Sequence, residues 1–179
     1  MKKEGGCKVA PSEKMNEITR LVEQYGNDVL RTAFVMLKSR ELAEDAYQET
    51  FVRVCRYYDS FRGECSEKTW ITGIAINVCR DMLRSAWKRR VTVTDDFSLH
   101  TSESNTEEII ESKDEKEELV RSIMKLPDKY REMIHLYYYQ ELDIKEISRV
   151  LKIPGGTVKS RLFKARSLLA EMMGGEANG

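Results

Sequence analysis

Apolar side chains recur every three or four positions along most of this 179-residue chain, which is the spacing of one face of an α-helix. Residues 15–37 show the pattern most clearly, and residues 41–58 and 67–88 repeat it. Alternation of apolar and polar residues, which predicts a β-strand, nowhere persists. The pattern therefore predicts an all-α protein.

Two short helices with a brief break between them are predicted in residues 142–169. Asp143 is expected to cap the first helix, with Glu146 as its capping-box partner three residues later. Pro154 stands where the first turn of the second helix tolerates a proline. Two short helices joined by a turn of this length are typical of a helix-turn-helix.

The polar face of that second helix carries small and basic side chains. Small residues permit close approach to base edges, and Lys and Arg reach phosphates or guanine acceptors. Residues 145–166 hold 7 basic residues and 1 acidic one. A basic face exposed to solvent is the simpler alternative, but beside a helix-turn-helix we expect this face to enter a DNA groove. The candidate DNA-contacting residues are Thr157, Lys159, Ser160, Phe163, Lys164 and Arg166.

The charge is unevenly distributed although the formal net charge is zero. Residues 1–90 hold 17 basic and 13 acidic side chains and residues 121–179 hold 11 and 7, while residues 91–120 hold 2 and 10. We therefore predict two small helical domains, residues 15–90 and 114–173, joined by a flexible acidic linker, residues 91–113. The acidic residues of the linker either keep it solvated or mimic the negative charge of a nucleic acid. The first 14 residues are expected to be disordered.

Several functions are disfavoured by what the sequence lacks. No apolar run approaches the roughly 18 residues of a membrane span, and the N-terminus has no secretory signal, so a cytoplasmic protein is expected. The four cysteines form no C-x-x-C pair, and the two histidines do not stand at ligand spacing from them, so neither a metal nor another cofactor is expected. Free thiols are expected, with a redox switch as the alternative. No catalytic arrangement is visible, so we expect neither an enzyme nor a small-molecule substrate.

The outer face of the predicted helix 41–58 carries Glu41, Asp45, Gln48 and Glu49. An ordinary solvated face is one interpretation. Because the surrounding block is basic, a protein-binding surface is the other.

A polar loop and the helix after it combine aromatic and basic residues. A basic stripe beside exposed aromatic rings is typical of single-stranded nucleic-acid binding. Trp70 either belongs to this surface or to the core. The candidate residues are Phe61, Arg62, Gly63, Asn77, Arg80, Arg84 and Lys88.

Taken together, the two halves resemble the extracytoplasmic-function (ECF) group of bacterial sigma factors, the promoter-specificity subunits of RNA polymerase. The resemblance spans roughly residues 20–172. It rests on the segments DAYQETF (45–51), FRGE (61–64) with TW (69–70), IAIN (74–77), DMLR (81–84), LPDKYR (126–131) and PGGTVKSR (154–161).

The resemblance implies a non-catalytic protein whose partners are core RNA polymerase and promoter DNA, duplex and single-stranded. Residues 41–49 would dock on the polymerase, the 61–67 loop with Asn77 would hold a flipped base of the melting element, and the second helix of the helix-turn-helix would read the distal element. An anti-sigma factor, often membrane-anchored, is a further implied partner. The alternative is a stand-alone helix-turn-helix regulator.

Two positions depart from the family pattern. Lys152 stands at the helix-turn-helix corner where relatives often have Gly, so a positive φ there would be strained. Tyr137 replaces an Arg that some relatives use, which puts one phosphate contact in doubt.

Overall fold

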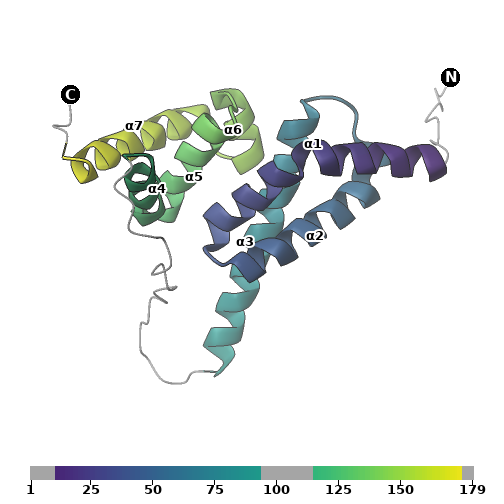
Figure 1. The fold of residues 1–179 in the computed structure, drawn as a ribbon, viewed down its shortest axis with the longest axis horizontal. Helices are drawn as coiled ribbons and strands as arrows, with labels where there is room; N and C mark the ends of the chain where they lie inside the picture. Colours follow the sequence, from purple (N-terminus) through teal and green to yellow (C-terminus); the bar gives the residue numbers. More distant parts are fainter. Residues whose placement is uncertain (1–10, 94–114, 175–179) are drawn as a thin grey trace.

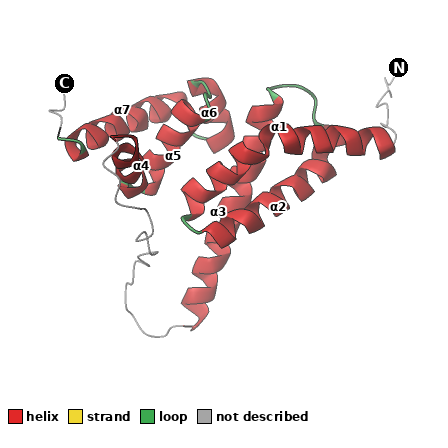
Figure 2. Ribbon diagram, viewed as in Figure 1, coloured by secondary structure: helices red, strands yellow, loops and turns green. Residues whose placement is uncertain are grey.

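Residues 11–93 and 115–174 are described by the computed structural model of the chain. Within these ranges every regular element is a helix, which confirms the all-α prediction (Figure 2). The helices form two modules that lie side by side, with α1–α3 in one and α4–α7 in the other (Figure 1).

The first module consists of α1 (Pro11–Leu37), α2 (Arg40–Tyr57) and α3 (Glu67–Val93), with a short 3-10 turn, η1 (Tyr58–Ser60), after α2. Helix α1 begins at Pro11, so the prediction of disorder was wrong for residues 11–14; residues 1–10 lie outside the described residues. Helix α3 continues to Val93, three residues into the segment predicted as linker, and the rest of that segment is not described.

Local capping explains where these helices end and begin. Lys38 breaks α1 by adopting a left-handed backbone conformation with φ of 55°. Ser39 then caps α2, because its Oγ accepts a hydrogen bond from the Leu42 amide at 3.3 Å. Ser66 does the same for α3 by accepting from the Thr69 amide at 3.1 Å.

The core of the first module forms where the three helices meet. Its centre is made of side chains that are almost inaccessible to solvent, and half-buried aromatic rings pack around it. Tyr57, the last residue of α2, is 47% exposed. The central residues are Leu21, Val29, Val54, Ile71 and Ala75.

The second module consists of α4 (Glu115–Lys125), α5 (Asp128–Ile134), α6 (Ile144–Leu151) and α7 (Gly155–Met172), with one π-helical turn, η2 (His135–Tyr139), continuing α5. Helix α7 lies across α5 and α6 and buries Val158, Leu162 and Ala165 between them. The result is a small helical body that carries the helix-turn-helix at one end.

The helix-turn-helix has the predicted capping box. The Asp143 carboxylate accepts a hydrogen bond from the Glu146 amide at 2.8 Å, and the Glu146 carboxylate accepts one from the Asp143 amide at 3.0 Å. Lys152 takes the left-handed conformation that the family's glycine suggests, with φ of 55° and ψ of 44°. Pro154 lies one position earlier than predicted, as the N-cap of α7 rather than in its first turn.

The two modules share apolar surface, which the expectation of two domains on a tether did not include. Helix α6 packs on α3, and Ile76 of α3 is completely buried in the core of the second module. Gly73 faces α6 at this crossing: a Cβ atom built on it would lie 3.9 Å from a methyl carbon of Val150. Alanine would therefore fit at position 73, whereas a larger side chain would push the modules apart.

Candidate nucleic-acid and polymerase surfaces

The outer face of α7 presents the residues predicted to read duplex DNA. Lys159, Ser160 and Lys164 are exposed, and Phe163 is 65% exposed, which is unusual for an aromatic side chain. Thr157 is half-buried at the first turn. Because Val158, Leu162 and Ala165 anchor the opposite face of the helix, this polar face is held outward by the core.

Arg166 is tied to aromatic side chains of its own module. Its Nε donates a hydrogen bond to the hydroxyl of Tyr138 at 2.8 Å, and its guanidinium carbon lies 5.5 Å from the ring centres of both Tyr137 and Tyr138. These cation–π contacts connect α7 to η2. Arg166 is thus held by η2 of its own module, although it lies seven residues after Lys159 and therefore on the same side of α7.

An aromatic pair underlies the loop between η1 and α3. The rings of Phe61 and Trp70 are stacked, with centroids 4.7 Å apart. Both side chains are half-buried, so Trp70 belongs partly to the core and partly to the surface. Gly63 allows the loop to turn, because its φ of 69° lies in the region that disfavours other residues. Arg62 and Asn77 are exposed, and Asn77 lies two turns after Trp70 along α3.

The basic stripe on α3 is only partly free. Nη2 of Arg80 donates a hydrogen bond to Oε1 of Glu132 on α5 at 3.1 Å, so the second module holds this side chain. Arg84 is exposed, with its guanidinium 3.9 Å from the Asp81 carboxylate. The Lys88 side chain lies outside the described residues.

The outer face of α2 presents Glu41, Asp45 and Gln48 to solvent, as predicted. Glu49 is less available, because it accepts a hydrogen bond from Arg53 at 2.7 Å, and Arg53 also reaches Asp81 on α3. Two apolar side chains on the same helix, Leu42 (42% exposed) and Val52 (52% exposed), are also open to solvent. Sequence reasoning missed them, although a helical wheel drawn for residues 41–58 places them outside the buried stripe.

A row of hydrogen bonds joins the modules, and none of it was predicted. Thr69 donates to Glu146 at 2.5 Å, and Arg149 donates to the backbone oxygen of Glu64 at 2.9 Å. Deeper in the interface, Nε2 of His135 lies 2.9 Å from Oγ1 of Thr32. The first helix of the helix-turn-helix therefore rests against the loop that carries the predicted base pocket.

Arg131 is the most deeply buried charge at this interface, with 1% of its surface exposed. It donates to the backbone oxygens of Val35 at 2.8 Å and Leu126 at 2.9 Å, and to the Asp128 carboxylate at 2.7 Å. Val35 lies in the last turn of α1, where backbone oxygens have no partner within the helix. That turn contains no basic residue of its own, so Arg131 supplies the positive charge that stabilises a helix C-terminus.

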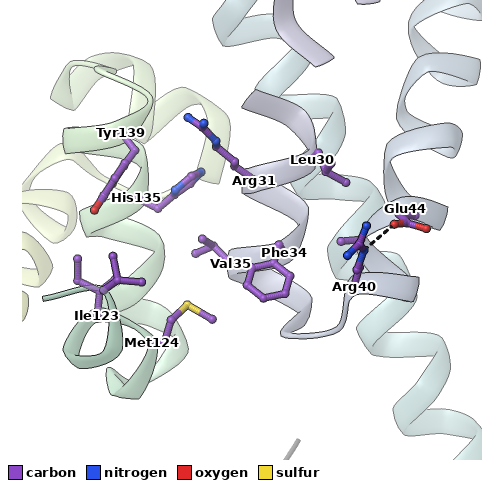
Figure 3. Close-up of a pocket in the computed structure, with 12 residues that line it drawn as sticks. Leu30, Arg31, Phe34, Val35, Arg40, Glu44, Ile123, Met124, His135 and Tyr139 are labelled. Atoms are coloured by element: carbon purple, nitrogen blue, oxygen red, sulfur yellow. Dashed lines mark hydrogen bonds and ion pairs between the residues drawn. The ribbon is translucent and has the colours of Figure 1, made fainter. Parts of the chain in front are cut away.

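An apolar cleft of about 650 Å³ opens between the modules. In Figure 3, Phe34 and Val35 of α1 lie across it from Ile123 and Met124 of α4, and Leu30 lines it on the side toward α2. Its rim is polar and includes an ion pair between Arg40 and Glu44, 3.0 Å apart. Its lining is mainly apolar, and His135 and Tyr139 are among the polar side chains that reach it.

The described residues contain no group of three His, Cys, Asp or Glu side chains arranged to hold a metal ion. Cys55, Cys65 and Cys79 are free thiols, and burial raises the pKa of Cys79 to about 12, so this thiol is unreactive. Cys7 lies outside the described residues. Among the described helices, none is long and apolar enough to cross a membrane.

Two family descriptions match this chain, one on each module. Residues 21–89 match sigma-70 region 2, and residues 116–169 match sigma-70 region 4. The paired matches define a sigma-70 type transcription protein.

Curated relatives place the chain more closely. It is 36% identical over 152 residues to the ECF RNA polymerase sigma factor SigM of Bacillus subtilis, which covers 85% of this chain and 92% of SigM. It is 32% identical over 165 residues to SigW of the same organism, with 86% and 87% covered. The chain belongs to the ECF group of RNA polymerase sigma factors.

Solved structures share the fold. The sigma factor RpoE in complex with the anti-sigma factor NepR from Bartonella quintana superposes with a TM-score of 0.71 at 20% identity, covering 89% of this chain and 98% of RpoE. CnrH in complex with the cytosolic domain of CnrY gives a TM-score of 0.63 at 20% identity, with 91% of each chain covered. At this identity the likeness concerns the fold alone.

Replacing Arg131 with Met tests its structural role. The substitution strands two buried backbone oxygens, so we expect the free energy of unfolding to fall by about 3 kcal/mol. Lys129→Met, an exposed position on the same helix, should cost much less. Urea denaturation followed by circular dichroism measures both variants, and equal stabilities would contradict the capping role.

Proposed function

We propose that this sigma factor binds core RNA polymerase through α2, holds the melted promoter strand through the 61–66 loop and α3, and reads duplex DNA through α7. The observation that carries the proposal is the separation of three chemically distinct exposed surfaces on three different elements. An acidic and apolar face, an aromatic loop with a basic stripe, and a small-residue face with lysines suit three different partners. A non-catalytic role in the cytoplasm, with no cofactor, follows from this assignment.

The duplex-reading role of α7 is supported by its construction. The helix follows the capped α6 and the left-handed Lys152, as the second helix of a helix-turn-helix does. Ser160 leaves room beside a base edge, and Lys159 and Lys164 are free to reach phosphates or guanine acceptors. Phe163 offers an exposed apolar ring, which suits contact with a thymine methyl group.

The melted-strand role is supported by the stacked Phe61–Trp70 pair. A flipped base needs a snug apolar surface against which it can stack and a polar group that reads its edge. The aromatic pair supplies the first, and the exposed Asn77 and Arg62 supply the second. Arg80 and Arg84 are positioned to follow the phosphate backbone. For Arg80 this requires that its ion pair with Glu132 be given up.

The polymerase-binding role is supported by the combination of charge and apolar surface on α2. Glu41 and Asp45 are near neighbours of the exposed Leu42 on α2, and Gln48 is exposed one turn beyond Asp45. An apolar residue with a polar rim is the usual composition of a protein interface. We assign Leu42 to this interface together with the predicted residues, and Glu49 to the internal ion-pair network that holds the helix in place.

We also propose an anti-sigma protein as a partner. The structural neighbours RpoE and CnrH were solved in complex with NepR and with the cytosolic domain of CnrY, respectively. The apolar cleft between the modules of this chain is a surface that such a partner could cover. A stand-alone helix-turn-helix regulator is not favoured, because region 2 occupies the position where a sensing domain would be expected.

Run-off transcription tests the proposed function directly. Purified chain added to core RNA polymerase on a promoter library should produce discrete transcripts, because specificity would come from the added chain. Core polymerase alone is the control and should give none. Absence of specific initiation on every template would overturn the proposal.

Reversing the charge of α2 should weaken polymerase binding. We expect Asp45→Arg with Gln48→Ala to reduce affinity for core polymerase at least tenfold, because a like-charge contact in an interface costs more than 1.4 kcal/mol. Glu23→Arg, on an exposed site of α1, makes the same charge change elsewhere. Affinity is measured by fluorescence anisotropy, with helicity checked by circular dichroism. Equal affinities of the two variants would contradict the assignment.

Removing one lysine from α7 should weaken duplex binding. Lys164→Ala should lower the affinity of the polymerase holoenzyme for distal-element DNA about tenfold and reduce the slope of log affinity against log salt by about one. Lys125→Ala removes the same charge from an exposed position on α4. An unchanged salt slope for Lys164→Ala would exclude a phosphate contact by this lysine.

A further inference from the structure

A buried polar cluster lies where the two modules meet, beside the apolar cleft that His135 also lines. His135 on η2 is 4% exposed, Thr32 on α1 is 1% exposed, and Gln140 is 1% exposed. Gln140 donates from its Nε2 to the backbone oxygen of Asp28 and to Oγ1 of Thr32, each at 3.2 Å. The cluster therefore joins residues that are more than 100 positions apart in the chain.

The hydrogen bonds of the cluster place a proton on Nε2 of the imidazole. Thr32 donates its only hydroxyl proton to the Asp28 backbone oxygen at 2.6 Å. The 2.9 Å contact between Thr32 Oγ1 and His135 Nε2 is then a hydrogen bond donated by Nε2. A neutral ring with its proton on Nε2 satisfies this arrangement. Oε1 of Gln140 is buried without a hydrogen-bond partner, so the cluster contains one unsatisfied acceptor.

The charged groups around His135 do not stabilise the positively charged form of its imidazole ring. Asp28 on α1 attracts a positive imidazole, but Arg31 on α1 and Lys68 on α3 repel it. Lys68 also holds part of the Asp28 charge, because its ammonium nitrogen lies 3.6 Å from the Asp28 carboxylate. The ring of Tyr139 stacks on the imidazole, with ring centroids 6.0 Å apart, and shields it from water. A cation at this position is therefore poorly solvated.

We infer that His135 is a proton-operated latch between the two modules: its neutral form belongs to the closed arrangement, and its protonated form favours separation. The inference rests on the position of the ring at an interface. Separation removes Thr32, Arg31 and Lys68 from the surroundings of the ring and exposes it to water.

The direction of the effect follows from linkage. Burial lowers the pKa of His135 from 6.5 to about 4 in the closed arrangement. The closed arrangement thus has its full stability above pH 6.5 and loses it as the pH falls toward 4. In this range the ratio of separated to closed molecules rises about tenfold per pH unit. Between pH 7.5 and pH 5.5 the ratio of separated to closed molecules is therefore expected to rise about tenfold in total, because little of the rise occurs above pH 6.5.

Glu132 at the same interface acts in the opposite direction. Burial raises the pKa of its carboxyl group, so the closed arrangement holds that proton more tightly than the separated one. Acidification through Glu132 alone would therefore favour closure. The Glu132→Gln variant removes this opposing titration and isolates the contribution of His135.

Release of the latch has a consequence that rests on the proposed function. In the closed arrangement Glu132 holds Arg80, and Arg149 contacts the backbone of the loop that carries the proposed base pocket. Separation frees both. Protonation of His135 would then increase the fraction of chains whose region 2 surface is ready for DNA.

The test is the pKa of His135 in full-length protein, measured by NMR of the imidazole Cε1–H signal. The chain has two histidines, so His100 is an internal reference and His100→Gln assigns the signals. In the unsubstituted protein we expect His135 to titrate below pH 5. Gly73→Phe, which places a ring against Val150, should separate the modules and return His135 to near 6.5. Gly73→Ala, which fits, should leave its pKa low.

Small-angle X-ray scattering verifies that Gly73→Phe increases the radius of gyration, and circular dichroism verifies that the helices persist. If Gly73→Phe remains compact, Gly73→Arg serves as the separated form, because its charge cannot remain buried at the crossing. A His135 pKa near 6.5 in the unsubstituted protein would overturn the inference. A low pKa that persists in a separated variant would overturn it too, since burial would then be independent of the interface. Neither result bears on transcription activity.

Discussion

The closed arrangement depends on one buried guanidinium group. Helix α1 ends without a basic residue in its last turn, and α5 of the other module carries Arg131 to that end. The same group satisfies the Leu126 oxygen and pairs with Asp128 at the start of α5. A buried charge must have all of these partners. Arg131 therefore fixes the end of α1, the start of α5 and their separation together.

The working surfaces differ in how strongly this arrangement restricts them. The outer face of α7 is anchored only by its own module, so it is exposed whether or not the modules touch. The α3 stripe is different, because Arg80 is bonded across the interface to Glu132. Under the proposed function, duplex recognition by α7 is thus independent of the interface, whereas contact of α3 with the melted strand is coupled to it.

The features predicted from sequence are those that depend on local spacing. The capping box at Asp143 and the buried stripe of α7 follow from residues three or four positions apart, and both are present. The link between Thr32 and His135 spans 103 positions and has no local pattern. A histidine in an apolar stretch is compatible with many environments. Only tertiary packing decides which one it has, and for the same reason the Tyr138 contact of Arg166 was not foreseen.

The two carboxylate oxygens of Glu146 accept hydrogen bonds from different modules. Oε2 accepts from the Asp143 amide within the capping box, and Oε1 accepts from Thr69 of the other module. Loss of the second contact leaves the first intact. The helix-turn-helix can therefore exchange a protein neighbour for water without unravelling at its first turn, so the module can undock as a rigid, already folded unit.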